Sequence, residues 1–179
     1  MTSRTSLCTT RFTDETWEEN CNYRKKYTSI GCIYATPFLL NVRIPKRSRV
    51  YVIEMNNSQN RIMGIGLVRN YAIVQKYRIY SNEDYNRYVF LGKYRLDRSQ
   101  ITDTRLLERI EKFCFHGKGH QKRLRGITCI SSQKWIDWAT EHWFMQVEKN
   151  KVYVPHVLMM IDGLFRKEFQ LLCKSEIHW

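Results

Sequence analysis

This chain of 179 residues is poor in the residues that break or loosen a backbone, with three prolines, eight glycines and no low-complexity tract. Hydrophobic residues make up 43% and aromatic residues 13%, so the chain can bury enough apolar surface to fold and is not expected to be disordered. No internal repeat at solenoid spacing is visible. The length suits one domain with a core. We expect that domain at residues 1–130, with a helical extension at 131–179 packed on it.

Long hydrophobic runs are also absent. The longest apolar stretch, "HVLMMIDGLF", is too short to span a bilayer and carries Asp162. The first residues, "MTSRTSLCTTRF", lack the apolar run of a signal peptide, so we expect an intracellular protein of the cytoplasm or nucleus with no membrane partner. Cysteines are present but without paired spacing, which favours reduced thiols; they stand at positions 8, 21, 32, 114, 129 and 173.

Acidic residues are scarce in the middle of the chain. Residues 61–130 hold fifteen Lys or Arg against six Asp or Glu, whereas residues 131–179 hold six of each. Most of the formal net charge of +13 therefore belongs to one region. A concentrated basic surface attracts polyanions and gains free energy from counterion release. The charge distribution predicts a nucleic-acid partner, RNA or DNA.

Helical patterns lie near both ends. Acids crowd the first turns and bases the last turns of Thr13–Lys26, which predicts a helix capped by Thr13 or Asp14. "DTRLLERIEKFCF" from residue 103 has one apolar stripe and an Asp/Thr cap. "SSQKWIDWATEHWFMQV" and "PHVLMMIDGLFRKEFQLLCK" read as two further amphipathic helices. Their apolar faces make the C-terminal helices a candidate contact for a protein partner.

The middle of the chain reads as β-structure. "SIGCIYATPFLLNVRI" predicts two short strands, because Pro37 and Pro45 interrupt it. "RVYVIEMNNSQNRIMGIGLV" predicts a hairpin that turns at "NNSQN". "AIVQKYRIY" and "YNRYVFLGKYRL" predict further strands with Tyr and Arg on one face, a mixture that suits single-stranded nucleic acid. Gly64 and Gly66 share one strand face and indicate close approach of a helix, another backbone or a flat ligand.

The hairpin "VYVIEMNNSQNRIMGIGLV" and the upstream "YTSIGCIYAT" resemble the corresponding segments of YTH domains. The resemblance covers roughly residues 11–100. YTH, EVE and ASCH domains share the PUA-like fold, and several members bind RNA or modified bases. The resemblance implies an α+β fold: a small curved β-barrel of PUA-like type with flanking helices, here with the helical C-terminal extension. It also implies a base pocket, which we place at Cys32, Tyr34, Gly64 and Asn70.

One YTH feature is missing from this chain. YTH domains close an aromatic cage on a methylated adenine, with a Trp in the strand that reads "SIGCIYA" here. This chain has Gly31 at that place and no tryptophan from Glu18 to Lys134. The methyl-reading cage therefore does not carry over, although Tyr34 remains able to stack on a base.

The stretch "KFCFHGKGHQKRLRGIT", Lys112 to Thr128, admits three chemical interpretations. Cysteine and histidine could hold zinc, but C-x-H-x3-H-x8-C matches no common zinc module, and we assign no metal and no cofactor. A nucleotide-binding loop needs Ser or Thr after the lysine, which Lys118 lacks. The third interpretation is a phosphate-binding loop, because its glycines let the backbone approach a phosphate and its clustered cations can bind one. The predicted nucleic-acid contacts are Lys118, His120, Lys122, Arg123 and Arg125, with Arg69 and Arg78 on the strands.

The leading hypothesis is thus a nucleic-acid-binding protein that recognises RNA or modified-base DNA through a PUA-like pocket and a basic surface. A structural or assembly component of a viral or ribonucleoprotein particle is the first alternative. An enzyme on the same fold that processes nucleotides or nucleic acid is the second. We assign no catalytic residue, because the carboxylates are scattered rather than paired in a recognisable motif.

Overall fold

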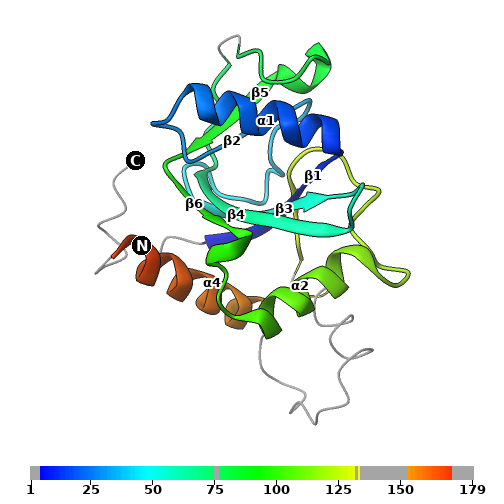
Figure 1. The fold of residues 1–179 in the computed structure, drawn as a ribbon, viewed down its shortest axis with the longest axis vertical. Helices are drawn as coiled ribbons and strands as arrows, with labels where there is room; N and C mark the ends of the chain where they lie inside the picture. The colour runs from blue at the N-terminus through cyan, green and yellow to red at the C-terminus, as the bar shows by residue number, and fades with distance from the viewer. Residues whose placement is uncertain (1–4, 75–76, 132, 134–152, 171–179) are drawn as a thin grey trace.

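A computed structural model describes residues 5–74, 77–131, 133 and 153–170 of the chain (Figure 1). Its elements in chain order are β1 (Thr5–Phe12), α1 (Asp14–Lys26), β2 (Cys32–Thr36), β3 (Arg49–Asn56), β4 (Arg61–Arg69), the 3-10 turn η1 (Glu83–Asn86), β5 (Tyr88–Gly92), β6 (Tyr94–Asp97), the 3-10 turn η2 (Arg98–Gln100), α2 (Thr104–Phe115), β7 (Thr128–Cys129) and α4 (Tyr153–Phe169).

The strands form a five-stranded sheet in the order β6-β4-β3-β1-β7 and a two-stranded sheet of β2 and β5. β1 and β3 are parallel, and the remaining pairs between named strands are antiparallel. The α+β class is therefore confirmed. The small curved β-barrel of PUA-like type is not, because the strands of the described residues divide between two sheets and close no barrel.

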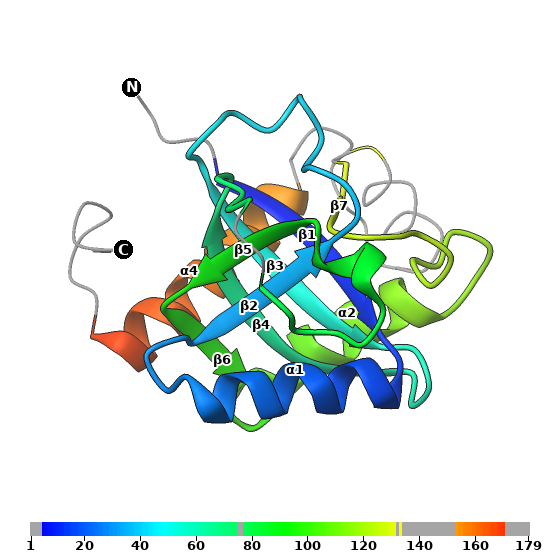
Figure 2. The same ribbon diagram turned by 90° about the horizontal axis from the view of Figure 1, so that it is seen from above.

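The five-stranded sheet is buried on both faces. In Figure 1, α1, β2 and β5 lie above it, and α2 and α4 lie below; Figure 2 shows α1 and β2 from above. Alternate residues of β3 supply the two cores, since successive strand side chains point to opposite faces. Tyr51 and Ile53 pack with α2 and α4, whereas Val50 and Val52 pack with β2 and β5. This explains why β3 is buried at every position.

Local sequence signals account for the helices and the hairpin. Thr13 and Thr16 form a capping box at the start of α1, and Asp103 accepts a hydrogen bond from the Leu106 N–H at the start of α2. The β3–β4 hairpin turns at residues 57–60, as predicted from "NNSQN". α4 includes Pro155 near its start, also as predicted, and its Ile161 and Phe165 join the lower core. No helix in the described ranges is long and apolar enough to cross a membrane.

One strand was missed and two predicted strands need correction. The first strand, β1, lies between β3 and β7 in the five-stranded sheet and was not predicted. The prediction of a strand after Pro37 is wrong, because residues 37–48 form turns and irregular backbone. "AIVQKYRIY" forms only the bridge between Ile73 and Val89 in its described part. The tryptophan-rich segment "SSQKWIDWATEHWFMQV" lies almost entirely outside the described residues, so the helix expected there and the domain boundary stay predictions.

Candidate nucleic-acid interface

Arg11, at the end of β1, holds the basic loop that connects α2 to β7. Its Nε donates to the carbonyl of Gln121 at 2.6 Å, and its Nη1 donates to the carbonyl of Gly126 at 2.9 Å. The same guanidinium reaches the hydroxyls of Thr9 and Thr128. Burial lowers the pKa of Arg11 to about 10, so the side chain stays charged at neutral pH. One half-buried cation thus ties both ends of the segment 121–128 to the central sheet.

The β3–β4 turn supports the loop from a second side. The Asn57 Nδ2 donates to the carbonyl of Lys122 at 3.0 Å, and the Lys122 Nζ donates to the Asn60 Oδ1 at 2.6 Å. Within the loop, the Gln121 N–H donates to the carbonyl of Cys114 at the end of α2. Gly126 has a φ of 64°, a conformation that glycine adopts without strain. These contacts fix the backbone conformation of the loop.

The anchored loop presents its cations outward. Lys118, Arg123 and Arg125 are exposed, while His120 and Lys122 are half-buried. The ion pairs found among the described residues use other cations, namely Arg49, Arg78, Arg87, Arg95, Arg98 and Arg166. The five predicted loop contacts are therefore brought together, on a held backbone, with positive charge that no described acid pairs. Phe113 and Cys114, just before the loop, are buried in the core as expected.

A hollow of about 400 Å³ lies between this loop and α1. Lys122, Leu124 and Gly126 line it on the loop side, and Arg11 lies in its wall. The far wall comes from the start of α1 and from the segment around η1, with Tyr80, Asn82 and Tyr85. The hollow combines two basic groups with aromatic and amide side chains, but Glu15 and Glu19 also line it. These side chains suit the base and sugar of a nucleotide better than a free phosphate, because the two glutamates repel anions.

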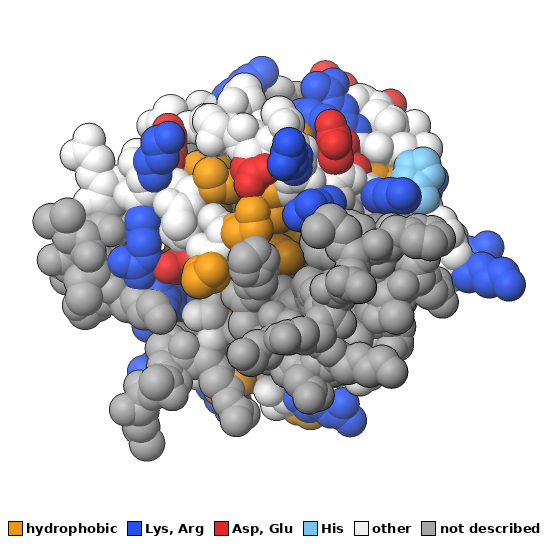
Figure 3. Space-filling model, turned by 90° about the horizontal axis from the view of Figure 1, so that it is seen from below, with side chains coloured by type: hydrophobic (Ala, Val, Ile, Leu, Met, Phe, Trp, Pro, Cys, Tyr) orange, Lys and Arg blue, Asp and Glu red, His pale blue; other side chains and the backbone are white. Residues whose placement is uncertain are grey.

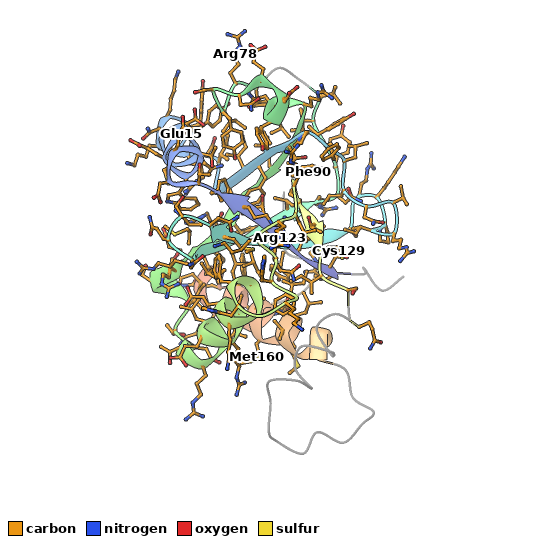
Figure 4. All side chains as sticks on the ribbon, turned by 90° about the vertical axis from the view of Figure 1, so that its right-hand side faces the viewer. Glu15, Arg78, Phe90, Arg123, Cys129 and Met160 are labelled. Atoms are coloured by element: carbon orange, nitrogen blue, oxygen red, sulfur yellow. The ribbon has the colours of Figure 1, made fainter. Side chains whose placement is uncertain are left out.

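A second, more open hollow of about 1000 Å³ adjoins the first. Both are lined by Glu19, and the chain passes from Arg78 and Ile79 in one to Tyr80 in the other. Its aromatic wall is Tyr23, Tyr27 and Tyr77, with Lys26 beside them. Figure 4 shows Arg78 and Arg123 well apart from one another. The two hollows therefore adjoin at Glu19, and together, from the basic loop to Arg78, they are called the track below.

The α1 part of this track was not predicted. The Tyr23 and Tyr27 rings lie 4.7 Å apart, and the Lys26 Nζ lies 5.5 Å from the Tyr27 ring centre. Tyrosines four residues apart on a helix share a face, so "YRKKY" carried the signal. Arg78, predicted as a contact, lies on the track and pairs with Glu83 at 3.4 Å on the exposed surface.

Three of the four residues expected to form a base pocket, Cys32, Tyr34 and Gly64, lie inside the protein, and Asn70 is half-buried. Cys32 and Tyr34 of β2 are 0% and 1% exposed. The Tyr34 hydroxyl donates to Glu54 at 2.7 Å, and Arg95 donates to the same carboxylate at 2.8 Å. Burial raises the pKa of Cys32 to about 12 and the pKa of Tyr34 further from its ordinary value.

The close approach predicted at the two glycines does occur. A Cβ on Gly66 would lie 2.0 Å from the Tyr34 hydroxyl oxygen and 2.8 Å from the Cys32 sulfur. A Cβ on Gly64 would lie 2.5 Å from the Leu96 carbonyl oxygen. Side chains of β2 and backbone of β6 therefore take the space that a ligand would need. The base pocket stays a prediction that this packing does not support.

Arg69 and Asn70 lie at the far end of the hairpin from the basic loop. The loop contacts the turn at residues 57–60, and β4 runs from Arg61 away from it, so Arg69 is roughly 25 Å distant at about 3.3 Å per residue. Asn70 donates to the carbonyl of Ile44 and fixes the segment before β3. The structure therefore places neither residue with the loop cations.

The cysteines and histidines near the loop do not form a metal cluster in the described residues. Cys114 is fully buried in α2, whereas His116 is exposed beyond the end of that helix. Cys129 lies on β7 opposite Cys8. Nowhere in the described ranges do three or more His, Cys, Asp or Glu side chains lie around one point as metal ligands would.

Comparison with known proteins gives a weak structural likeness. No family model matches the chain, and no curated protein matches it. Among solved structures, the chain is similar to the YTH domain of the Zygosaccharomyces rouxii MRB1 protein, solved in complex with N6-methyladenosine RNA. The TM-score is 0.37 at 10% identity, over 82% of this chain and 92% of that chain. A likeness at this level establishes neither family membership nor function.

Proposed function

We propose that this protein binds single-stranded nucleic acid along the track that begins at the basic loop. The observation that carries the proposal is the clustering of Lys118, Lys122, Arg123 and Arg125 on a loop that Arg11 and Asn57 hold in place. Pre-ordered cations lose little conformational freedom on binding. Each one that meets a phosphate releases counterions, which favours binding without regard to sequence.

The loop cations bind phosphates only, and the two hollows add surfaces on which bases can stack. Bases stack on aromatic side chains irrespective of sequence, and a single strand can turn its bases into a groove while its backbone meets cations. In this arrangement the loop takes phosphates, and the Tyr23, Tyr27 and Tyr77 wall takes bases. Glu15 and Glu19 line the path between them and disfavour phosphates there. The Glu19 carboxylate accepts hydrogen bonds from Ser81, which holds it in position.

The salt dependence of binding tests this proposal. Single strands lose about 0.7 in the log–log slope for each phosphate neutralised, so four contacts give a slope of about −2.8. We therefore expect the affinity for a fluorescent 12-nucleotide RNA to fall about fiftyfold between 50 and 200 mM salt, measured by anisotropy. A DNA strand of the same sequence and the matching RNA duplex show which strand is preferred. Undetectable binding at 50 mM salt, or an affinity unchanged by salt, would count against the proposal.

The other two hypotheses stay predictions. If the protein is a component of a viral or ribonucleoprotein particle, we expect a protein partner to bind its C-terminal helices. Those are the last helix and the tryptophan-rich segment, which lies almost entirely outside the described residues. Co-purifying nucleic acid, read from the absorbance ratio at 260 and 280 nm, separates that hypothesis from nucleic-acid binding. A turnover assay with nucleotides and oligonucleotides, with and without chelator, addresses the enzyme hypothesis.

A further inference from the structure

Two cysteines face each other at the foot of the basic loop. Cys8 of β1 and Cys129 of β7 are direct partners in an antiparallel register. At the neighbouring pair, the Ile130 N–H donates to the Leu7 carbonyl at 2.9 Å. Hydrogen-bonded and non-hydrogen-bonded pairs alternate along an antiparallel ladder, so Cys8 and Cys129 occupy a non-hydrogen-bonded position.

That position brings the two thiols within bonding range. Residues at non-hydrogen-bonded positions have Cα atoms about 4.5 Å apart, closer than those at hydrogen-bonded positions. Disulfides span Cα separations of about 4.4–6.8 Å, so a bond can form here with little backbone movement. Both thiols are free in the structure.

The two thiols differ in chemical character. Cys8 is fully buried, whereas Cys129 is half-buried and so partly open to small reagents. A hydrogen bond with the Cys8 thiol lowers the pKa of Cys129 to about 7, and the same contact raises the pKa of Cys8. Because the thiolate is the reactive form of cysteine, Cys129 is the nucleophile of the pair and Cys8 is the resolving thiol.

We propose that Cys8 and Cys129 form a redox-responsive dithiol that hydrogen peroxide converts into a cross-strand disulfide. The Cys129 thiolate attacks the peroxide oxygen, the O–O bond breaks, and the departing hydroxide takes a proton to give water. The Cys8 sulfur then attacks the Cys129 sulfenic acid, the S–O bond breaks, and the second hydroxide leaves as water with the Cys8 proton. Two thiols are oxidised by two electrons, and one peroxide is reduced to two waters.

The cross-link would act on the basic loop. β7 follows the loop directly, and Arg11, three residues after Cys8 on β1, already holds Gly126 and Thr128 by hydrogen bonds. A covalent bond beside these contacts would prevent the end of the loop from separating from β1. The chemistry is independent of the proposed function, since the disulfide forms whether or not the loop binds nucleic acid.

Peptide mapping of the oxidised full-length chain tests the proposal. The reduced protein is treated with a small excess of hydrogen peroxide, unfolded in denaturant so that every free thiol is alkylated, and digested without reductant. We expect one linked peptide pair that joins Cys8 to Cys129, lighter by two hydrogens than the separate peptides and split by dithiothreitol. The melting temperature of the oxidised protein should rise by roughly 10 °C.

Two variants define the specificity of the reaction. Cys129→Ser should abolish the linked pair and the rise in melting temperature. Cys21→Ser, which changes a half-buried cysteine of α1, should leave both unchanged. The proposal is overturned if Cys8 remains fully alkylatable after oxidation of Cys129, or if Cys129 links to a different cysteine of the chain. Neither result would bear on nucleic-acid binding, which the salt series measures separately.

Discussion

Reversal of charge at Lys122, Arg123 and Arg125 to glutamate is expected to weaken binding of single-stranded nucleic acid by about two orders of magnitude or more at moderate salt. Three phosphate contacts are lost, and three acids then repel the backbone. The steepness of the salt dependence should fall by about 0.7 for each lost contact, because fewer counterions are released. Anisotropy titrations at several salt concentrations measure both quantities.

A matched variant separates the loop from charge in general. Arg105 and Lys112 of α2 and Lys167 of α4 are exposed cations of the helices that cover the other face of the sheet. On that face, cations are interspersed with acids where side chains are described (Figure 3). Their reversal to glutamate makes the same change in net charge, and we expect a much smaller loss of affinity. Equal losses for both variants would show that net charge, not the loop, governs binding. Circular dichroism and melting curves confirm that both variants fold.

Replacement of Arg11 by methionine is expected to destabilise the protein by about 3 kcal/mol, since the carbonyls of Gln121 and Gly126 lose a charged donor. For a chain of this size, that loss lowers the melting temperature by about 10 °C. Hydrogen exchange across residues 116–128 should accelerate more than exchange in β3, because the loop loses its tie to the sheet. Affinity for nucleic acid should fall as well, since the loop must then be ordered on binding.

Arg87→Met is the control for this change. Arg87 pairs with Asp84 at 3.2 Å near η1, and both side chains are largely exposed. Exposed ion pairs contribute about 0–1 kcal/mol, so the melting temperature should hardly move. If Arg11→Met and Arg87→Met behaved alike, Arg11 would not be the anchor of the loop.

Local signals in the sequence predicted the parts of the fold that depend on near neighbours. The α1 and α2 caps, the turn of the hairpin and the stripe of α4 all follow from spacing over a few residues. β1 does not. "TSLCTTRF" shows no regular alternation of apolar and polar side chains, and its partners are β3, some forty residues away, and β7, more than a hundred away. Pairing with strands so far away in the chain cannot be inferred from the residues of β1 itself.

The candidate site also has one part that the sequence predicted and one part that it did not. The loop cations were predicted because they are adjacent in sequence. Their support by Arg11 was not, since nothing near "TTRF" indicates that this arginine contacts a loop more than a hundred residues away. The glycines of β4 correctly indicated close approach, but the approaching groups are Tyr34 and Cys32 of β2 at Gly66 rather than a ligand. The track along α1 depends on how the helix lies beside residues 77–82, which only the fold determines.

The measurement that tests the central claim most directly is hydrogen exchange of the full chain with and without saturating single-stranded RNA at low salt. The account predicts protection of residues 116–127 and the turn at 57–60, with weaker protection along residues 23–27 and 77–82. Unchanged exchange in the loop, with protection appearing elsewhere, would contradict it.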